Sequence, residues 1–195
     1  MSDHANIHPA IKPAQLQRLY QVSKVIHSVL DQQKALELIV REAVGLVNAT
    51  TGSVVLINPT DRLLEIQTAH GLPESSSRLK LRMGEGITGW VAQHGKPALV
   101  PDVREDARYV KVHNHTLSEL AIPLEVNGSV CGVINVDSDQ LNAFSETDQA
   151  LLSELASQAA IVIHNAFLYE RSRIRANLFE SLITCLLYTS DAADE

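Results

Sequence analysis

Asn127-Gly128 constrains the fold of this chain more than any other feature, because the dipeptide separates two apolar runs. The runs are SELAIPLEV (residues 118–126) and SVCGVINVD (residues 129–137). Asn and Gly both tolerate the positive φ angles that a two-residue hairpin turn requires. The sequence therefore predicts an antiparallel β-hairpin over residues 118–137.

The two-residue turn also predicts a register for this hairpin. Counting outward from the turn pairs Leu120 with Asn135 and Ser118 with Asp137. Opposed residues share a face of a sheet, so Ser118, Asn135 and Asp137 converge at the polar end of an apolar face. An apolar floor with a few convergent polar groups is typical of a small-molecule site. Alternatively, these side chains cap the sheet edge and bond to loop backbone.

Glu119 lies on the opposite face in this register. However, Pro123 in the same run has no N–H to donate, and such a residue often marks a bulge or a sheet edge. A bulge there would reverse the alternation of faces and bring Glu119 beside Asn135 and Asp137.

The rest of the chain places helical patterns on both sides of a strand-rich centre. Apolar stripes predict helices over 13–30, 36–47 and 152–169, the last opened by a capping box from Ser145 to Asp148. A short helix over 87–94, capped at Gly95, and strands over 53–57, 63–69 and 98–100 are also predicted. Helices, then strands, then a helix favour an α+β layer fold over a βαβ series.

Composition excludes several classes of protein. Of 195 residues, 45% are hydrophobic and 20% are charged, which is typical of a globular domain. The net charge of -7, without a Lys/Arg stripe, predicts no nucleic acid and no membrane as partner. The polar start predicts no signal peptide and no apolar run approaches a membrane span, so we expect a cytoplasmic protein. Two cysteines without ligand spacing predict no metal site, and we interpret His113 and His115 as a solvated pair.

The chain divides into four parts. Residues 1–12 have no periodicity and are expected to be disordered, and residues 13–170 are expected to form the domain. Residues 171–184 continue the last helical pattern as a linker or signalling helix. Residues 185–195, CLLYTSDAADE, resemble translated adapter sequence, so we expect a non-native tail on a fragment of a longer protein. A frayed natural helix end is the alternative.

A series of short motifs, taken in order, resembles the GAF domain family. The motifs are ATTGSVVL (49–56), GEGITGWVA (84–92), PDV (101–103), SELAIPL (118–124), GVINVD (132–137) and FSETD (144–148). The resemblance implies a GAF/PAS-like central antiparallel sheet of about six strands with helices packed on it. It also implies a small-molecule pocket under the loops that precede residue 118. Such domains usually control an output domain, for example in two-component or cyclic di-GMP signalling.

One branch of this family is catalytic, namely the free methionine-(R)-sulfoxide reductases, which need a pair of thiols. This chain has Thr88 where the resemblance places one cysteine, and it has none in the segment for the other. In that branch the equivalents of Glu119, Asn135 and Asp137 are carboxylates that hold the substrate, so Asn135 departs from the pattern. We therefore expect no catalytic residue, and we interpret Cys131 as a small buried hydrophobe.

The cofactor-binding branches match no better. Bilin-binding relatives attach the pigment to a cysteine beside the pocket, which this chain lacks. Cyclic-nucleotide-binding relatives carry Asn-Lys and Phe-x-x-x-Asp-Glu, but this chain has Val136 for the Lys and Gln149 for the Glu. The ligand and any cofactor therefore stay unidentified.

Loop residues above the expected floor complete the candidate site. Arg108 can clamp an anion through two hydrogen bonds, or it can pair with Asp102 or Asp106 instead. Trp90 and Tyr109 are compatible with a ligand contact and with a core role. The predicted ligand-binding set is Trp90, Asp102, Arg108, Tyr109, Ser118, Glu119, Asn135 and Asp137.

The first and last helices suggest a partner. Leu16–Leu30 and Leu152–Tyr169 each carry a stripe wide enough to pack on the sheet and on a second copy, so we expect a homodimer. Besides the reductase, two functions are then open. The domain senses an unidentified small molecule and passes its state through the terminal helices, or it serves only for dimerisation or partner binding.

Overall fold

The computed structural model describes residues 32–73, 79–110, 115–165 and 168. The predicted helix over 13–30, the disordered N-terminus, the linker and the C-terminal tail lie outside these residues and stay predictions. In the described part, the predicted helices are α2 (Gln32–Leu46), α3 (Gly86–His94) and a helix of residues 146–165. The stripes and caps therefore located the described helices to within a few residues.

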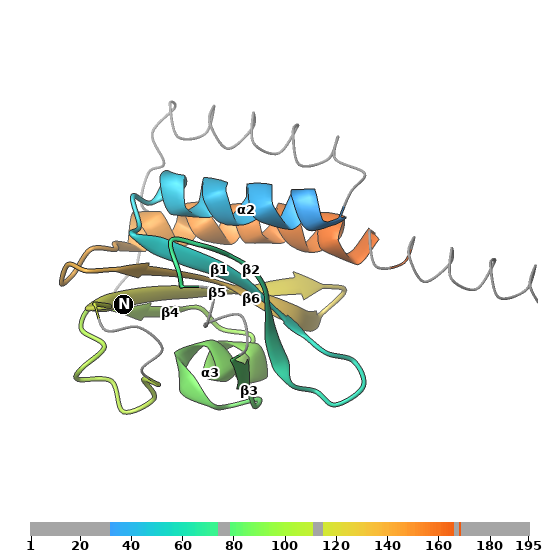
Figure 1. Ribbon diagram of the computed structural model, residues 1–195, viewed down its shortest axis with the longest axis horizontal. Coiled ribbons are helices and arrows are strands. Elements are labelled where there is room, and N and C mark those ends of the chain that lie inside the picture. Colours follow the sequence, from blue (N-terminus) through green and yellow to red (C-terminus); the bar gives the residue numbers. More distant parts are fainter. Residues whose placement is uncertain (1–31, 74–78, 111–114, 166–167, 169–195) are drawn as a thin grey trace, which may run out of the picture.

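Six strands form one antiparallel sheet in the order β3-β2-β1-β6-β5-β4, which confirms the predicted α+β fold (Figure 1). The strands are β1 (Thr51–Ile57), β2 (Leu64–His70), β3 (Lys80–Leu81), β4 (Ala98–Val100), β5 (Ser118–Val126) and β6 (Ser129–Ser138). The sequence patterns indicated every strand except β3. With two residues, β3 is too short to show any periodicity.

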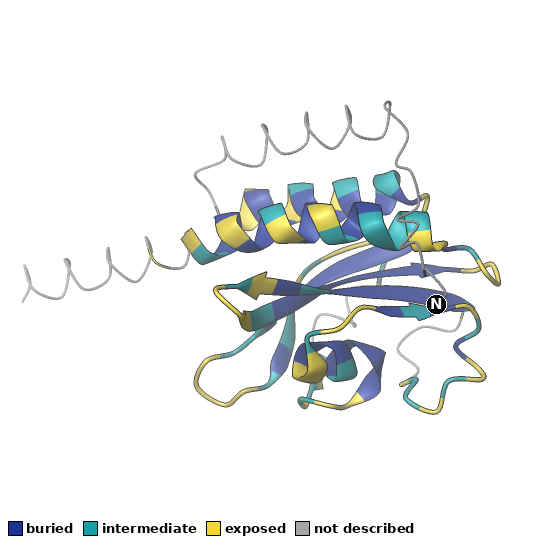
Figure 2. Ribbon diagram, turned by 180° about the vertical axis from the view of Figure 1, so that it is seen from behind, coloured by how far each residue is buried: buried dark blue, intermediate teal, exposed yellow. Residues whose placement is uncertain are grey.

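Two helices cover one face of the sheet. The helix of residues 146–165 and α2 lie side by side on it, with buried sides toward the strands and exposed sides outward (Figures 1 and 2). Leu36, Ile39, Leu152 and Leu155 pack there against alternate residues of the central strands. This helix-side core holds most of the large buried side chains of the domain.

The predicted capping box opens the later helix. The Ser145 backbone N–H donates to Asp148 Oδ2 at 2.9 Å, and the Asp148 N–H donates to Ser145 Oγ at 3.3 Å. Both bonds satisfy N–H groups that the first turn of a helix cannot pair internally. Within the described ranges, no helix combines the length and the apolarity needed to cross a bilayer.

The opposite face carries α3 and the loops around it (Figure 1). Ile87 and Val91 of α3 pack with Ala121 and Val133 of the sheet in a smaller core. As predicted, α3 ends at Gly95, which has a φ of 63° and donates its N–H to the Val91 carbonyl at 2.9 Å. A left-handed residue here favours glycine, which has no Cβ to clash.

The predicted register of the β5–β6 hairpin is wrong beyond the turn. Val126 pairs with Ser129 as expected, but the register shifts after Glu125, and Leu124 pairs with Gly132. Cys131 is therefore the extra residue of a β-bulge. Because side chains alternate with a period of two, one inserted residue exchanges the faces of everything beyond it.

The bulge decides which side chains share the α3 side of the sheet. Glu119 pairs with Asp137, Ala121 pairs with Asn135, and Ser118 pairs with Ser138. Glu119 thus joins Asn135 and Asp137, as a bulge at Pro123 would also have arranged, although the bulge lies in the facing strand. Ser118 lies on the helix side.

We expect Gly132→Ala to destabilise the domain by about 3 kcal/mol, because the bulge leaves no room for a side chain. An added Cβ would lie 2.4 Å from the Val55 carbonyl oxygen and 2.6 Å from Leu56 Cδ2. The control is Gly128→Ala in the turn, where nothing lies within 4 Å and only the positive φ of 75° is strained, at a cost of about 1 kcal/mol. Urea unfolding measures both, and equal losses would contradict the tight packing at the bulge.

Candidate functional site

A pocket lies between the α3 side of the sheet, α3 itself and the segments before β3 and β5. Its volume is about 60 Å³. A cavity needs roughly 10–15 Å³ to hold one water molecule, so this pocket has room for several. The space suits a molecule of a few non-hydrogen atoms. The lining residues are Ser53, Val55, Leu64, Ile66, Leu72, Leu79, Leu81, Gly86, Ile87, Thr88, Tyr109, Val110, Thr116, Glu119, Asn135 and Asp137.

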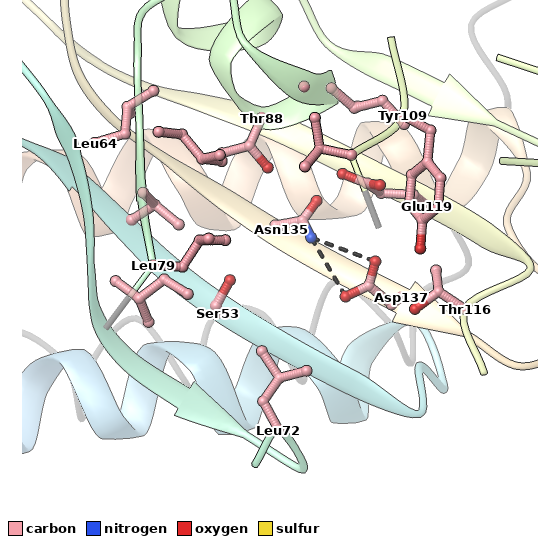
Figure 3. A pocket seen from close by; sticks show the side chains of 16 residues that line it. Ser53, Leu64, Leu72, Leu79, Thr88, Tyr109, Thr116, Glu119, Asn135 and Asp137 are labelled. Atoms are coloured by element: carbon pink, nitrogen blue, oxygen red, sulfur yellow. Dashed lines mark hydrogen bonds between the residues drawn. The ribbon is translucent and has the colours of Figure 1, made fainter. Parts of the chain in front are cut away.

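The lining is divided into an apolar and a polar side (Figure 3). Leu64, Leu72 and Leu79 lie on one side, and the carboxyl groups of Glu119 and Asp137 lie on the other. Small ligands are usually held in this way, with apolar walls supplying contact and a few polar groups fixing the orientation.

Glu119 and Asp137 form a buried acidic pair. They are directly paired residues of β5 and β6, and they are 5% and 8% exposed. Asp137 accepts hydrogen bonds from neutral donors: Thr51 Oγ1 at 3.3 Å, and Asn135 Nδ2 at 3.4 and 3.3 Å to the two carboxyl oxygens. No hydrogen bond or ion pair between described residues ends on the Glu119 carboxyl.

This environment disfavours ionisation of both acids. Burial raises the pKa of Glu119 well above its usual value, and the charge of Asp137 raises it further. Burial likewise raises the pKa of Asp137 to about 6, against the lowering effect of the Thr51 and Asn135 hydrogen bonds. Two neighbouring carboxyls in an apolar pocket therefore retain a proton at pH values where exposed acids are ionised.

Asn135 adds an unused acceptor to the pair. Its Nδ2 donates to Asp137, but its Oδ1 is buried and has no hydrogen-bond partner among the residues that the structure describes. A buried polar atom without a partner costs on the order of 1–3 kcal/mol, and such atoms are uncommon in native proteins. This polar cluster, which lines a cavity and keeps an acceptor in reserve, is therefore a candidate ligand-binding site.

Four predicted site residues line this pocket: Tyr109, Glu119, Asn135 and Asp137. Tyr109 lies beside the acidic pair, with Thr116 close to its hydroxyl group (Figure 3). Burial raises the pKa of Tyr109, and the charges of Asp137 and Glu119 act in the same direction. Tyr109 is therefore a neutral hydroxyl at the polar side of the pocket.

The other four predicted residues do not line the pocket. Ser118 is buried on the helix side, where its Oγ donates to the Gln140 carbonyl at 2.8 Å, so it bonds loop backbone as the alternative interpretation had it. Asp102 is held by Arg104, whose Nε and Nη2 donate to its two oxygens at 2.9 and 2.6 Å.

Arg108 and Trp90 form a stack beside the pocket. The Arg108 guanidinium lies 4.5 Å from the Trp90 ring centroid, and Trp90 stacks in turn on His94 at 4.5 Å. Arg108 also donates to both oxygens of Asp106, at 2.9 and 2.6 Å, which was the alternative to an anion clamp. Because Tyr109 follows Arg108 directly, these contacts hold the pocket-lining segment against α3.

Sequence reasoning missed Ser53, Thr88 and Thr116 as polar lining residues, and it missed the apolar wall. Ser53 lies two residues along β1 from Thr51, and its partner on β6 is Asn135. That partner could be found only from the order of the strands, because β1 and β6 are far apart in the sequence. Thr88 lies in the recognisable GEGITGWVA motif, but the family resemblance distinguishes it only as a residue that replaces a cysteine.

The free energy of unfolding of the Asp137→Asn variant, relative to that of the wild type, should increase as the pH rises. An acid whose pKa is raised by folding stabilises the folded state below its unfolded pKa, and that contribution is lost as the pH rises through the folded value. For Asp137 the loss falls between about 3.8 and 6, so the stability difference between variant and wild type should change by on the order of 2–3 kcal/mol from pH 4 to 7.5. Denaturant unfolding at several pH values measures it. Asp139→Asn, which removes an exposed carboxyl from the same chain segment, is the control, and parallel curves for the two variants would contradict the prediction.

Arg108→Ala should destabilise the domain by about 1–2 kcal/mol, more than Arg104→Ala does. Both arginines bond an aspartate two residues earlier, but only Arg108 stacks on Trp90, and its side chain is 33% exposed against 62% for Arg104. Thermal unfolding of the two variants gives the comparison. An equal effect would mean that the stack contributes nothing.

Comparison with known proteins places this fold and pocket in a family. Residues 29–164 match the GAF domain family. The Nif-specific regulatory protein of Azospirillum lipoferum is 30% identical over 131 residues, which are 63% of this chain and 21% of that protein. The chain thus spans about a fifth of the length of that regulatory relative.

Solved structures agree with this fold. The GAF domain from Acinetobacter phosphoenolpyruvate-protein phosphotransferase has a TM-score of 0.74 and 23% identity, over 81% of this chain and 97% of that chain. Free methionine-R-sulfoxide reductase from Neisseria meningitidis has a TM-score of 0.73 and 22% identity, over 86% and 99%. At such identities the two likenesses show a shared fold alone, whereas the family match covers most of the chain. The chain belongs to the GAF domain family.

Proposed function

We propose that this GAF domain is a regulatory sensor that binds a small molecule in the pocket at Glu119, Asn135 and Asp137. The unpaired Asn135 Oδ1 beside two buried carboxyls is the observation that carries the proposal, because a bound molecule would complete this polar cluster. A role in regulation is supported by the match to the Nif-specific regulatory protein.

The sheet supplies a route by which a ligand can act on the helices. Asn135 and Asp137 line the pocket, whereas Ile134 and Val136, their neighbours in β6, pack in the helix-side core. A ligand that draws β6 toward α3 therefore changes the packing beneath α2 and the helix of residues 146–165. Such a change biases a downstream domain only if the ligand binds the two arrangements with different affinities. In this proposal the terminal helices lead to an output domain of a longer cytoplasmic protein.

The positions of the thiols support a sensor rather than a reductase. Cys131 lies at the bulge and packs against the helix-side core, where its Sγ donates to the Leu124 carbonyl at 3.3 Å. Burial raises the pKa of the Cys131 thiol, which disfavours the nucleophilic thiolate. Cys185 lies outside the described residues. Thr88 occupies the pocket position where the family resemblance places a reductase cysteine.

A second candidate function is dimerisation, and the last helix carries the observation that favours it. The apolar stripe predicted for this helix packs in the chain's own core, because Leu152, Leu155 and Ala159 are fully buried there. Ile161 and Leu168 nevertheless remain 49% and 53% exposed, and their spacing of seven places them on one side of a helix. A second copy covering these two side chains would pair the domain through this helix.

Native mass spectrometry of the freshly purified full chain tests the sensor proposal. We expect a retained small molecule, or a stabilising one in a metabolite screen by thermal unfolding, whose binding is lost in Thr88→Leu. The larger side chain fills part of the pocket and removes a hydroxyl group, while leucine remains a good helix former.

Gln93→Leu makes a similar change on the exposed side of the same helix and should bind like the wild type. If no molecule binds the wild type, or if Thr88→Leu binds all molecules equally well, the pocket is not a sensor site. Measurement of the oligomeric state in the same spectra then shows whether the dimerisation function remains.

A further inference from the structure

The ligand that the pocket can hold is restricted by the kind of polar groups that it offers. Glu119 and Asp137 in their ionised forms only accept hydrogen bonds, and Asn135 offers its free Oδ1, which is also an acceptor. The Asn135 amide hydrogens already serve Asp137. The pocket therefore presents acceptors and negative charge at its polar side, and it needs hydrogen-bond donors and positive charge in return.

Within the described ranges, no side chain supplies that positive charge to the pair through a hydrogen bond or an ion pair. Arg108 is the cation that acts on Glu119, yet its guanidinium is in a two-bond contact with Asp106 and stacked on Trp90. Asp106 lies on the same side and adds a further negative charge near Glu119. The other described side chains near the pair are neutral, and they include the hydroxyl groups of Tyr109 and Thr116 (Figure 3) and that of Thr51, which donates to Asp137.

A metal ion is a poor match for the same acceptors. No group of three or more His, Cys, Asp or Glu side chains able to hold a metal occurs in the part of the chain that the structure describes. The opposite side of the pocket is formed by leucines, which favour hydrocarbon over the water shell of a hydrated ion. Charge and walls together favour an organic cation.

We infer that the pocket binds a compact organic cation, with an ammonium group at Glu119, Asp137 and Asn135 Oδ1 and a short hydrocarbon part against Leu64, Leu72 and Leu79. This inference rests on the proposed sensor function and specifies its ligand. An ammonium group has three donors for these three acceptors. The cavity of about 60 Å³ limits the molecule to a short chain.

The inference predicts a proton signature of binding. Without a ligand, the acidic pair retains a proton, because the proton removes one of two adjacent buried negative charges. An ammonium group takes over that role, so that the pair loses its proton as the cation binds. Affinity should therefore rise as the pH rises through about 6, the raised pKa of Asp137, by up to tenfold per unit where one proton is displaced.

Titration calorimetry with n-butylammonium chloride, 1-butanol and sodium butyrate tests the charge requirement. The three probes have chains of similar length and differ in charge. At pH 8 we expect the ammonium to bind at least tenfold more tightly than the other two. In buffers of different ionisation enthalpy near pH 6, we expect proton release on binding. Glu119→Gln and Asp137→Asn should each weaken ammonium binding at least tenfold.

Glu125→Gln is the matched control, because it removes the same charge from an exposed position of the same strand. It should leave the affinity unchanged. If either pocket variant fails to fold, the pH dependence and proton release of the wild type still decide the question.

Equal or tighter binding of the alcohol or the carboxylate would overturn the inference, as would pH-independent binding of the ammonium or the absence of any ammonium binding. The proposed function fails by a different result, namely a wild-type protein that binds no molecule in the Thr88-dependent screen. If the wild type retains an anion that the Thr88→Leu variant does not bind, the sensor proposal holds and the inference of a cationic ligand is refuted.

Discussion

The pairing of β5 with β6, including the single extra residue at Cys131, is the constraint on which the rest of the site depends. Beyond the bulge, Glu119 faces the same side of the sheet as Asn135 and Asp137, while Ser118 and Leu120 face the helices. Without the extra residue, a charged side chain would enter the helix-side core and apolar ones would line the pocket. Neither arrangement is tolerable, because burial of a carboxylate among leucines costs several kcal/mol. The bulge therefore fixes both cores of the domain at once.

The covering of the sheet on both faces bears on the proposed transmission from the pocket to the helices. Each of the central strands contributes alternate residues to the helix-side core and to the pocket, as Val54 and Val55 of β1 illustrate. Close-packed cores resist gradual deformation, so that a small shift of a strand is passed on to the helices rather than absorbed. The pocket lies on one side of this layer, α2 and the helix of residues 146–165 lie on the other, and the strands connect them.

Burial of the polar groups in the pocket costs free energy that contacts within the described fold do not offset. Two adjacent acids are buried here, and among the described residues Asp137 is held by neutral donors alone, while the Glu119 carboxyl and the Asn135 Oδ1 have no hydrogen-bond partner. Protein interiors rarely keep such groups unless they serve a function. The nearby arginine is instead committed to Asp106 and Trp90, where it fixes the loop that borders the cavity. Arg108 thus fixes the shape of the site and makes no ion pair with the acidic pair.

The sequence by itself determined the class of fold and every described element except β3. The stripes of the described helices, the Ser145–Asp148 cap, Gly95 and Asn127-Gly128 act through contacts between near neighbours, and each appears in the structure where the pattern indicated it. Asn135 and Asp137 were likewise found as candidates from the polar end of an apolar hairpin face, Glu119 from the possibility of a bulge, and Tyr109 as a residue of the loop before the hairpin.

Only the tertiary structure decided how these pieces meet. A bulge depends on the fit of two strands against a third, here Gly132 against the Val55 carbonyl, and no local pattern records that contact. Strand order joined Ser53 to Asn135, and the short β3 arose from its pairing with β2. The partners of Arg108 and Asp102 were likewise decided by the tertiary structure, because a guanidinium group binds whichever acceptor and aromatic ring the folded loop places nearest. Side-chain partners far apart in the sequence are set by packing, which the order of residues implies but does not display.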